Sequence, residues 1–341
     1  MKAAVLKDWG KLSVENVDTP TCGPNEAIVG VLYAGICGSD VHVYHHRHPT
    51  AQCPVIMGHE FVGRLLELPA GARPDLKVGD IVSAQPYLSC GLCDSCVRGR
   101  DNVCTSLKIF GIHTAGCFAE RVKVPAKKLF KVPDSVPLRT AAMIEPLAVA
   151  VHDVNISDMQ FGDTVFIIGG GPIGSLIGLV AKLNGAAKVV VSEINEGRGP
   201  FIESLGLTWV NPKRQDLAEE IKRLTAGKGF DIVFETSGTQ AGTDLMTAAV
   251  KNAGTIVLVG VPSGKFPTDT GSLLAKESRI VGVRLHSHFN FGKAIAMIQN
   301  PVIAETLNRM MTLELPLGRV DEGLQLVTKG EHMKIVLKIG G

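Results

Sequence analysis

Four cysteines lie close together in the first third of the chain. Cys90, Cys93, Cys96 and Cys104 are separated by two, two and seven residues. Zinc takes four soft ligands in a tetrahedron, and one short loop with this spacing can supply all of them. Because protein atoms would fill every position, we predict a closed, structural zinc site. An iron–sulfur cluster uses similar spacing, and a nucleic-acid-binding zinc ribbon has a longer gap between its pairs; no basic or aromatic run accompanies these cysteines.

A second set of metal-binding residue types is spread more widely. Cys37 and His59 each lie next to a glycine and close to an acid, and Glu60 and Glu145 offer carboxylates. Three protein ligands that leave one position open are typical of a catalytic zinc. Taken singly, a cysteine is more often a small buried apolar residue and a histidine a satisfied polar one. The combination predicts a second zinc, with Glu60 or Glu145 as the carboxylate ligand.

A glycine-rich turn follows in the second half of the chain. The segment GGGPIG at 169–174 fits the pattern G-x-G-x-x-G, with an apolar run before it and a helix-like segment after it. In that context a tight turn lets the backbone approach a pyrophosphate, and the helix N-terminus offers free N–H groups. The competing interpretation is a doubly wound domain with a different ligand. The residues predicted to bind a dinucleotide are Gly169, Gly171, Pro172, Ile173 and Gly174.

The acid after the next apolar run bears on the choice of cofactor. Glu193 ends the run that starts at Lys188, and such a carboxylate accepts hydrogen bonds from a ribose diol and repels a 2′-phosphate. This favours NAD over NADP. Arg198 is the opposing signal, since a guanidinium can bind a 2′-phosphate; otherwise it is a solvated helix residue or lies beside the adenine.

The pattern of apolar and turn-forming residues changes near residue 150. Before it, short β-branched runs are separated by Gly, Pro and Asp; after it, strand-like and helix-like segments alternate, which indicates a parallel sheet covered by helices. We predict an α/β fold with domains at 1–150 and 151–289. The segment 290–341 ends in a strand, 334–339, that returns to the first domain. Strands are expected at 27–33, 61–68, 81–84, 164–168, 188–192, 209–210, 231–235 and 255–259, and helices at 173–183, 196–205, 217–224 and 293–299.

Composition limits the classes of partner. The 341 residues carry a formal net charge of +2, with 45% hydrophobic and 20% charged residues, so nucleic acid is not expected as a partner. The longest uncharged apolar stretch, 165–181, is marginal for a membrane span and is broken by Gly and Pro. No signal peptide is visible, and eight cysteines without one favour metal or catalysis over disulfides. We expect a cytoplasmic protein that does not bind membranes.

These motifs, in this order, resemble the zinc-containing medium-chain dehydrogenases. The matching segments are GICGSDVH at 35–42, GHEFVG at 58–63, the cysteine loop at 90–104, IEP at 144–146 and GGGPIG at 169–174. The resemblance implies a GroES-like catalytic domain, a Rossmann domain, two zinc ions, a dinucleotide in the cleft between the domains, and a homodimer or homotetramer. Glu145 in the segment IEP is similar to the polyol and threonine dehydrogenase branch of the family, in which a carboxylate replaces a third cysteine-type ligand. The stretches SCGLCDSC, DNVCTSLKIFGIH and MIEPLAV are similar to dehydrogenases of L-gulonate, L-galactonate or L-idonate.

The resemblance also suggests roles for individual side chains. The substrate hydroxyl would bind the zinc, with Glu60 or Glu145 near the metal. Ser39 would accept the hydroxyl proton, His42 would pass it to solvent, and Asp40 would orient His59. For Ser39 the alternative is a turn hydroxyl, and for His42 a surface ring.

The substrate is expected to be small and polyhydroxylated. Arg284 is the candidate for contact with its carboxylate or with the nicotinamide, and His113 is a candidate for contact with the substrate. Further His and Arg residues lie at 45–48 and 286–288. For 45–48 a solvated loop is an equal alternative. The runner-up activities are sorbitol-type, galactitol-type and L-threonine dehydrogenase, and the non-enzymatic alternative is an NAD-binding regulatory protein.

The sequence departs from the family pattern at two positions. Cys117 stands where a Gly is frequent, which would strain the backbone if that position needs positive φ. Glu193 stands where Asp is commoner, and the longer carboxylate should still favour NAD.

Overall fold

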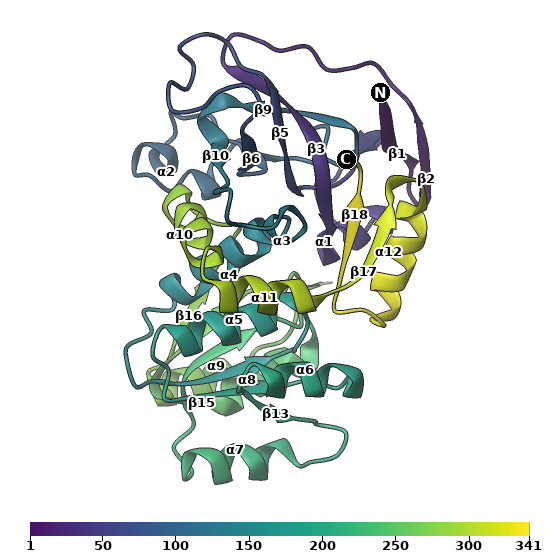
Figure 1. The fold of residues 1–341 in the computed structure, drawn as a ribbon. Coiled ribbons are helices and arrows are strands. Elements are labelled where there is room, and N and C mark those ends of the chain that lie inside the picture. The colour runs from purple at the N-terminus through teal and green to yellow at the C-terminus, as the bar shows by residue number, and fades with distance from the viewer. Residues whose placement is uncertain (263, 341) are drawn as a thin grey trace. The chain divides into compact units, whose positions relative to one another are not determined.

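The structure is a computed structural model that describes residues 1–262 and 264–340. Gly341, the end of the predicted C-terminal segment, lies outside them. The chain forms two compact units. One comprises residues 1–145 and 287–340, and the other is Pro146–His286. Figure 1 shows the C-terminal segment beside strands from the start of the chain. We refer to these parts as the β-rich unit and the nucleotide unit.

The β-rich unit is built around a seven-stranded sheet of order β10-β6-β5-β3-β18-β17, with β9 also paired to β3. A three-stranded sheet, β2-β1-β4, and a two-stranded sheet, β7-β8, complete it. The strands are β1 (Lys2–Asp8), β2 (Lys11–Asn16), β3 (Glu26–Ile36), β4 (Val55–Ile56), β5 (Glu60–Glu67), β6 (Ile81–Ala84), β7 (Tyr87–Leu88), β8 (Lys108–Ile109), β9 (Arg121–Pro125), β10 (Leu129–Lys131), β17 (Met311–Pro316) and β18 (Lys334–Lys338).

The helices of this unit are short before residue 145 and longer near the C-terminus. They are α1 (Gly38–Tyr44), α2 (Asp94–Val97), α3 (Leu138–Ala141), α10 (His288–Ile298), α11 (Pro301–Met310) and α12 (Val320–Lys329), with 3₁₀ turns η1 (Asp101–Val103), η2 (Ala126–Lys128) and η4 (Leu317–Arg319). Strand β18 pairs antiparallel with β3, placing Val336 opposite Gly35. The end of the chain therefore forms part of the same sheet as residues 26–36.

The nucleotide unit is a six-stranded sheet of order β13-β12-β11-β14-β15-β16 whose neighbouring strands are all parallel. This confirms the predicted parallel sheet with alternating helices. Its elements are β11 (Thr164–Ile168), α5 (Pro172–Leu183), β12 (Lys188–Ser192), η3 (Glu196–Arg198), α6 (Gly199–Ser204), β13 (Thr208–Val210), α7 (Leu217–Thr225), β14 (Phe230–Glu235), α8 (Gln240–Ala249), β15 (Val250–Leu258), α9 (Thr270–Lys276) and β16 (Arg279–Gly282).

Both faces of this sheet are buried, which explains the continuous apolar runs of its strands. Phe166, Val190, Phe230, Val233 and Ile256 are 0% exposed and belong to one core cluster. The sequence order reverses between β11 and β14, and ligands of doubly wound sheets bind beyond the carboxyl ends of the strands at such a point. The glycine-rich turn leaves β11 at that end.

Three differences from the sequence-based expectations have simple causes. Helix α4 (Ile144–Ile156) starts inside the region predicted to be mostly β; nearly all of its residues are buried, so it lacks an amphipathic period. The helix predicted at 196–205 is divided into η3 and α6 where Pro200 follows Gly199. The apolar stretch 165–181 is divided between β11 and α5, and no described helix has the length and apolarity to span a bilayer.

Candidate active site and metal centres

Cys37, His59 and Glu60 form a compact group of metal-binding side chains. One potential ligand atom from each lies within 4.8 Å of the others. The sheet explains this proximity, because Gly35 pairs with Glu60 across β3 and β5, and Cys37 follows the end of β3. Cys37 is also the N-cap of α1, rather than part of a simple turn. Two strand ends therefore bring together residues separated by more than twenty positions.

Asp40 contacts both Cys37 and His59 and so orients this group. Its Oδ2 accepts a hydrogen bond from the backbone N–H of Cys37 at 2.8 Å, and its Oδ1 lies 3.3 Å from His59 Nδ1. Asp40 is 0% exposed and His59 is 5% exposed. Burial alone would lower the pKa of His59, but the charge of Asp40 raises it well above its usual value. With Nδ1 facing Asp40, Nε2 is left as the ligand atom, which is the second-sphere arrangement typical of metal-bound histidine.

The group fits a zinc ion chemically, since a thiolate, an imidazole and a carboxylate converge in a buried place. Glu60 is 1% exposed. Burial raises the pKa of Glu60 above its usual range, Lys334 opposes this effect, and the charge of Glu145 adds to it. Glu145 is itself buried at 4% exposure but is not one of the three residues of the compact group. Of the two candidate carboxylates, the geometry favours Glu60 as the ligand.

Ser39 and His42 lie on the same helix as Asp40. Ser39 Oγ is 3.3 Å from His59 Nε2, so this hydroxyl borders the candidate metal position. His42 follows three residues later, which places both side chains on one face of α1. Burial, Arg47 and His45 lower the pKa of His42. A neutral imidazole is therefore favoured at neutral pH, as a proton acceptor requires.

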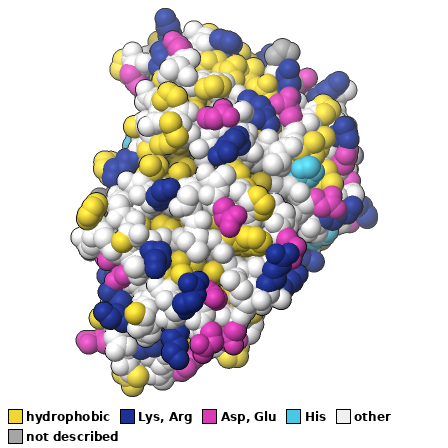
Figure 2. All heavy atoms as spheres, turned by 60° about the horizontal axis from the view of Figure 1, so that its bottom comes forward, with side chains coloured by type: hydrophobic (Ala, Val, Ile, Leu, Met, Phe, Trp, Pro, Cys, Tyr) yellow, Lys and Arg dark blue, Asp and Glu magenta, His cyan; other side chains and the backbone are white. Residues whose placement is uncertain are grey.

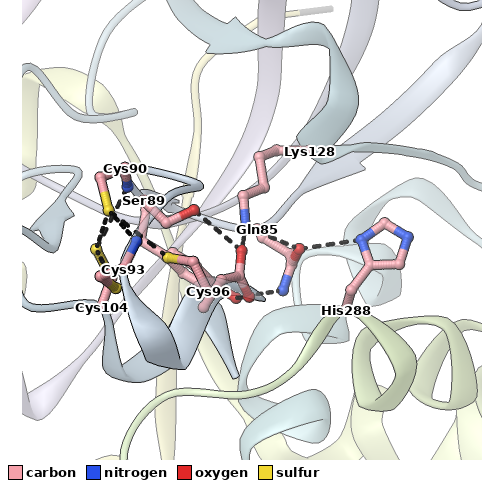
Figure 3. Close-up of polar contacts among 10 residues, drawn as sticks. Gln85, Ser89, Cys90, Cys93, Cys96, Cys104, Lys128 and His288 are labelled. Carbon is pink, nitrogen blue, oxygen red and sulfur yellow. Dashed lines mark hydrogen bonds and ion pairs between the residues drawn. The ribbon is translucent and has the colours of Figure 1, made fainter. Parts of the chain in front are cut away.

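The four cysteines of the loop come together as a separate centre (Figure 3). Their Sγ atoms are 3.5 Å apart for Cys90 and Cys104, 3.9 Å for Cys90 and Cys96, and 3.9 Å for Cys93 and Cys104. Four sulfurs at about 2.3 Å from one zinc ion stand about 3.8 Å from each other. An iron–sulfur cluster requires wider spacing, because its thiolates bind different irons. The distances thus fit a single ion.

Backbone N–H groups of this loop donate hydrogen bonds to the cysteine sulfurs, which stabilises the thiolate form. The N–H of Cys93 points to Cys90 Sγ at 3.3 Å, and the N–H of Ser106 points to Cys104 Sγ at 3.3 Å. Hydrogen bonds from the backbone of Thr105 and Cys96 lower the pKa of Cys93 to about 6. Deprotonated cysteine is the form that binds metal.

A buried polar network that the sequence did not indicate supports the loop from one side (Figure 3). Asp101 accepts hydrogen bonds from Lys128 at 2.5 Å, Tyr87 at 3.0 Å and Ser89 at 3.1 Å. Lys128 is only 3% exposed. The network continues through Gln85, whose Oε1 lies 3.2 Å from His288 Nδ1 at the start of α10. An isolated buried lysine has no periodic signature, so no sequence pattern pointed to it.

The dinucleotide loop has the backbone geometry that its glycines predicted. Gly169 adopts φ of +103°, a conformation that L side chains rarely adopt. A methyl group on Gly174 would collide with the carbonyl oxygen of Gly169, so the first turn of α5 packs directly on the loop. Gly171 is the N-cap and Pro172 and Ile173 begin the helix. As in any α-helix, the first N–H groups of α5 have no partner within the helix.

Glu193 is held firmly beside this loop. Its carboxylate accepts hydrogen bonds from the N–H of Gly170 at 2.9 Å and of Asn195 at 2.7 Å. Arg198 Nη1 lies 3.2 Å from the same carboxylate. The two residues with opposite implications for NADP therefore form an ion pair with each other.

The candidate substrate residues have local partners in the structure. His113 receives the N–H of Ile109 on Nδ1 at 3.0 Å, and its Nε2 lies 2.8 Å from Thr50 Oγ1. His46 stacks on Trp9 with ring centroids 4.1 Å apart. Arg284 is exposed on the segment after β16. The substrate roles of His113 and Arg284 stay predictions.

Cys117 shows no backbone strain. It is absent from the non-glycine residues with positive φ in the described chain. The residue is 0% exposed, and its thiol points to the carbonyl oxygen of Glu60 at 3.5 Å. The strain considered for this position is therefore not present.

Comparison with known proteins identifies the family. Residues 23–134 match the alcohol dehydrogenase GroES-like domain, and residues 172–300 match the zinc-binding dehydrogenase domain. A 2-dehydro-3-deoxy-L-galactonate 5-dehydrogenase of Pseudoalteromonas atlantica is 39% identical over 80% of each chain. The chain belongs to the zinc-dependent medium-chain dehydrogenases. The predicted combination of a GroES-like domain and a Rossmann domain is thereby confirmed.

Two further relatives show the breadth of this dehydrogenase family. An L-threonine 3-dehydrogenase of Chelativorans sp. is 32% identical over 99% of this chain and 98% of its own. A zinc-binding-dehydrogenase structure from Sinorhizobium meliloti, bound to NADP, superposes with a TM-score of 0.91 at 32% identity, covering 99% of this chain and 98% of the other. Membership makes this dehydrogenase an oxidoreductase and leaves its substrate and its preferred dinucleotide to the proposal below.

Proposed function

We propose that this dehydrogenase oxidises a secondary alcohol of a sugar acid, of the L-gulonate, L-galactonate or L-idonate type, with NAD as the hydride acceptor. The observation that carries the proposal is the largely buried group of Cys37, His59 and Glu60, which offers three of the four donors that a zinc ion takes. The sugar-acid assignment is supported by the 39% identity to a sugar-acid 5-dehydrogenase.

In the proposed reaction, the two bound groups supply the chemistry that side chains cannot: zinc acts as a Lewis acid on the alcohol, and the nicotinamide accepts hydride. The protein holds the donors, with Asp40 fixing His59 through the 3.3 Å contact. Ser39, whose Oγ lies 3.3 Å from His59 Nε2, would accept the hydroxyl proton while it gives its own proton onward. His42 then carries the proton to solvent, for which its lowered pKa suits it.

We propose two zinc ions per chain, one at each cysteine-containing group, and NAD as the preferred dinucleotide. The Sγ distances of 3.5–3.9 Å support the structural ion. The buried carboxylate of Glu193 beside the glycine loop supports NAD, and the NADP-bound relative is the reason to test both. Metal analysis after gel filtration should give two zinc ions per chain.

The partners proposed are a small polyhydroxylated substrate and other copies of this chain, in a homodimer or homotetramer. Lys and Arg side chains intermingle with Asp and Glu on the face drawn in Figure 2, which does not favour a nucleic-acid partner for that face. All eight cysteines are free thiols, which suits the reducing cytoplasm.

A substrate panel tests the activity. Initial rates with L-gulonate, L-galactonate, L-idonate, sorbitol, galactitol and L-threonine, each with NAD and NADP, should give the highest kcat/KM for one of the hexonates. L-Threonine is the second candidate, because a threonine dehydrogenase matches this chain over 99% of its length. Replacement of the exposed Arg284 by Met should raise KM for a hexonate far more than for a neutral polyol. Equal effects on both substrates would refute a carboxylate contact.

A further inference from the structure

Lys334 forms a buried ion pair with Glu60, although 274 positions separate the two residues in the chain. The Lys334 Nζ atom lies 2.7 Å from Oε1 and 2.5 Å from Oε2 of Glu60. Their side chains are only 3% and 1% exposed. The lysine thus contacts both oxygens of the carboxylate that borders the candidate catalytic zinc position.

Strand pairing in the sheet positions Lys334 beside Glu60. Val336 pairs with Gly35, and Gly35 pairs with Glu60, so β18, β3 and β5 run side by side at this point. Paired residues share a face of a sheet, and so do residues two apart on one strand. Lys334 and Glu60 therefore project from the same face. A methyl group on Gly35 would overlap Glu60 Oε2 and lie 3.2 Å from Lys334 Cε, so only glycine leaves room for the pair.

The Lys334–Glu60 ion pair lies among several buried acidic side chains. Asp40, Glu60 and Glu145 are all buried near Cys37. A zinc ion added to this group would attract a fully free Glu60 carboxylate, which could then bind through both oxygens and so fill the fourth position of the tetrahedron. A carboxylate that shares both oxygens with an ammonium group is a weaker and less mobile donor, because its negative charge is already partly neutralised.

We propose that Lys334 is a positioning residue that restrains Glu60 and so keeps one zinc coordination position available for the substrate. This inference rests on the proposed catalytic zinc. It makes the C-terminal strand part of the active site: the strand contributes no ligand but determines how firmly a ligand from β5 can bind. The residue does not contact substrate in this assignment.

Replacement of Lys334 by Met tests the role through metal binding. The variant Lys334→Met should bind zinc at the weaker of the two sites at least about tenfold more tightly than the parent, because a repelling positive charge is lost and Glu60 is released to the metal. Competition with a coloured chelator measures the affinity. In the cobalt-substituted protein, the visible d–d bands should change in the same variant, since they report the coordination of the ion. Dehydrogenase activity should fall at least about tenfold despite the tighter metal.

Three controls make the result specific. The variant Lys334→Arg keeps the positive charge and should retain the parent affinity and spectrum. In a Glu60→Gln background, Lys334→Met should tighten zinc binding much less than it does in the parent, because only the direct repulsion between the lysine and the ion is then lost. Lys131→Met removes a different lysine–carboxylate pair of the same unit, in which Lys131 Nζ lies 2.9 Å from Asp80 Oδ1, and should leave zinc affinity unchanged. If Lys334→Met does not fold, Lys334→Gln provides the same loss of charge.

The outcomes separate this inference from the proposed function. Unchanged or weaker zinc binding in Lys334→Met, in a parent that holds two zinc ions, overturns the role of Lys334 alone; weaker binding is what a purely structural lysine would produce. A parent protein that binds zinc only at its four clustered cysteines overturns the proposed function as well. Tightening of the same size in the Glu60→Gln background also overturns the role, because none of it then passes through Glu60.

Discussion

Glu193 should control the choice between NAD and NADP. Its carboxylate is 5% exposed and is fixed by the N–H groups of Gly170 and Asn195 at 2.9 and 2.7 Å. A carboxylate that cannot swing away keeps its charge where the adenosine ribose of a Rossmann ligand lies. We expect Glu193→Gln, which removes the charge and keeps the size, to shift binding toward NADP.

The magnitude follows from the charges involved. A unit charge on a 2′-phosphate about 5 Å from the carboxylate, at an effective dielectric constant of about 20, is repelled by about 3 kcal/mol. Salt and solvent at the edge of the sheet reduce this to about 2 kcal/mol, or about 30-fold in Kd. The substitution also frees Arg198, now 3.2 Å from Glu193, to pair with the phosphate. NAD should bind a few-fold more weakly, because its ribose diol loses an acceptor.

Trp209 provides the assay. Its Nε1 donates a hydrogen bond to the carbonyl oxygen of Glu193 at 3.0 Å, so its fluorescence reports on this position. Titration with NAD and NADP in a Trp9→Phe background should show the ratio Kd(NADP)/Kd(NAD) falling about 30-fold in Glu193→Gln. Glu196→Gln is the matched control, because that carboxylate is 56% exposed and pairs with Arg214. An unchanged ratio in Glu193→Gln, or an equal shift in the control, would refute the reasoning.

Three further predictions concern the cysteine loop and the network beside it. Chelation of zinc, or Cys96→Ser, should lower the thermal midpoint, since the ion closes the loop; calorimetry with and without zinc measures the shift. Lys128→Met and Asp101→Asn should each cost about 3 kcal/mol of unfolding free energy, because each leaves the other charge of a buried pair uncompensated, whereas the double variant should regain part of the loss in urea titrations. Burial and the charge of Lys128 lower the pKa of His288 in the folded protein. The unfolded chain therefore binds the proton of this imidazole more tightly, and the free energy of unfolding should fall as the pH drops below 6.5. His288→Gln should weaken this pH dependence of the unfolding midpoint.

The fold of the nucleotide unit was predictable because its signals are local. The expected strands at 164–168 and 188–192 coincide with β11 and β12, and the glycine-rich turn lies between β11 and α5 as expected. Each buried strand is a short apolar run bounded by turn residues, so its limits can be identified without knowledge of its neighbours. In the β-rich unit, 81–84 coincides with β6 for the same reason.

Several helices were missed because their patterns are weak or broken. Helix α11 begins with Asn300 as N-cap and Pro301 in its first turn, which are standard start signals, yet they directly follow the helix expected at 293–299. Helices α8 and α9 start at Thr239 and Asp269 caps after loops of small and polar residues. In each case the capping residue was a usable signal, while the apolar period was too short to identify the helix.

Some features of the candidate site were predictable from neighbouring residues in the sequence, and others depend on strands that are far apart in the chain. The cysteine spacing predicted a four-thiolate group, and the structure assembles it. Asp40, expected to orient His59, lies 3.3 Å from it. The choice between Glu60 and Glu145 depended on strand pairing, which no spacing in the sequence fixes, and the structure groups Glu60 with Cys37.

The Lys334–Glu60 pair shows why a site composed of known motifs still needs its tertiary structure. Cys37, His59 and Glu60 are each recognisable within a few residues of sequence, but the lysine that contacts Glu60 begins the last strand of the chain. Because β18 completes the sheet beside β3, the ion pair can form only after both ends of the β-rich unit have come together. A metal centre in this sheet therefore depends on its final strand for its charge balance, although the three grouped ligands are all present by residue 60.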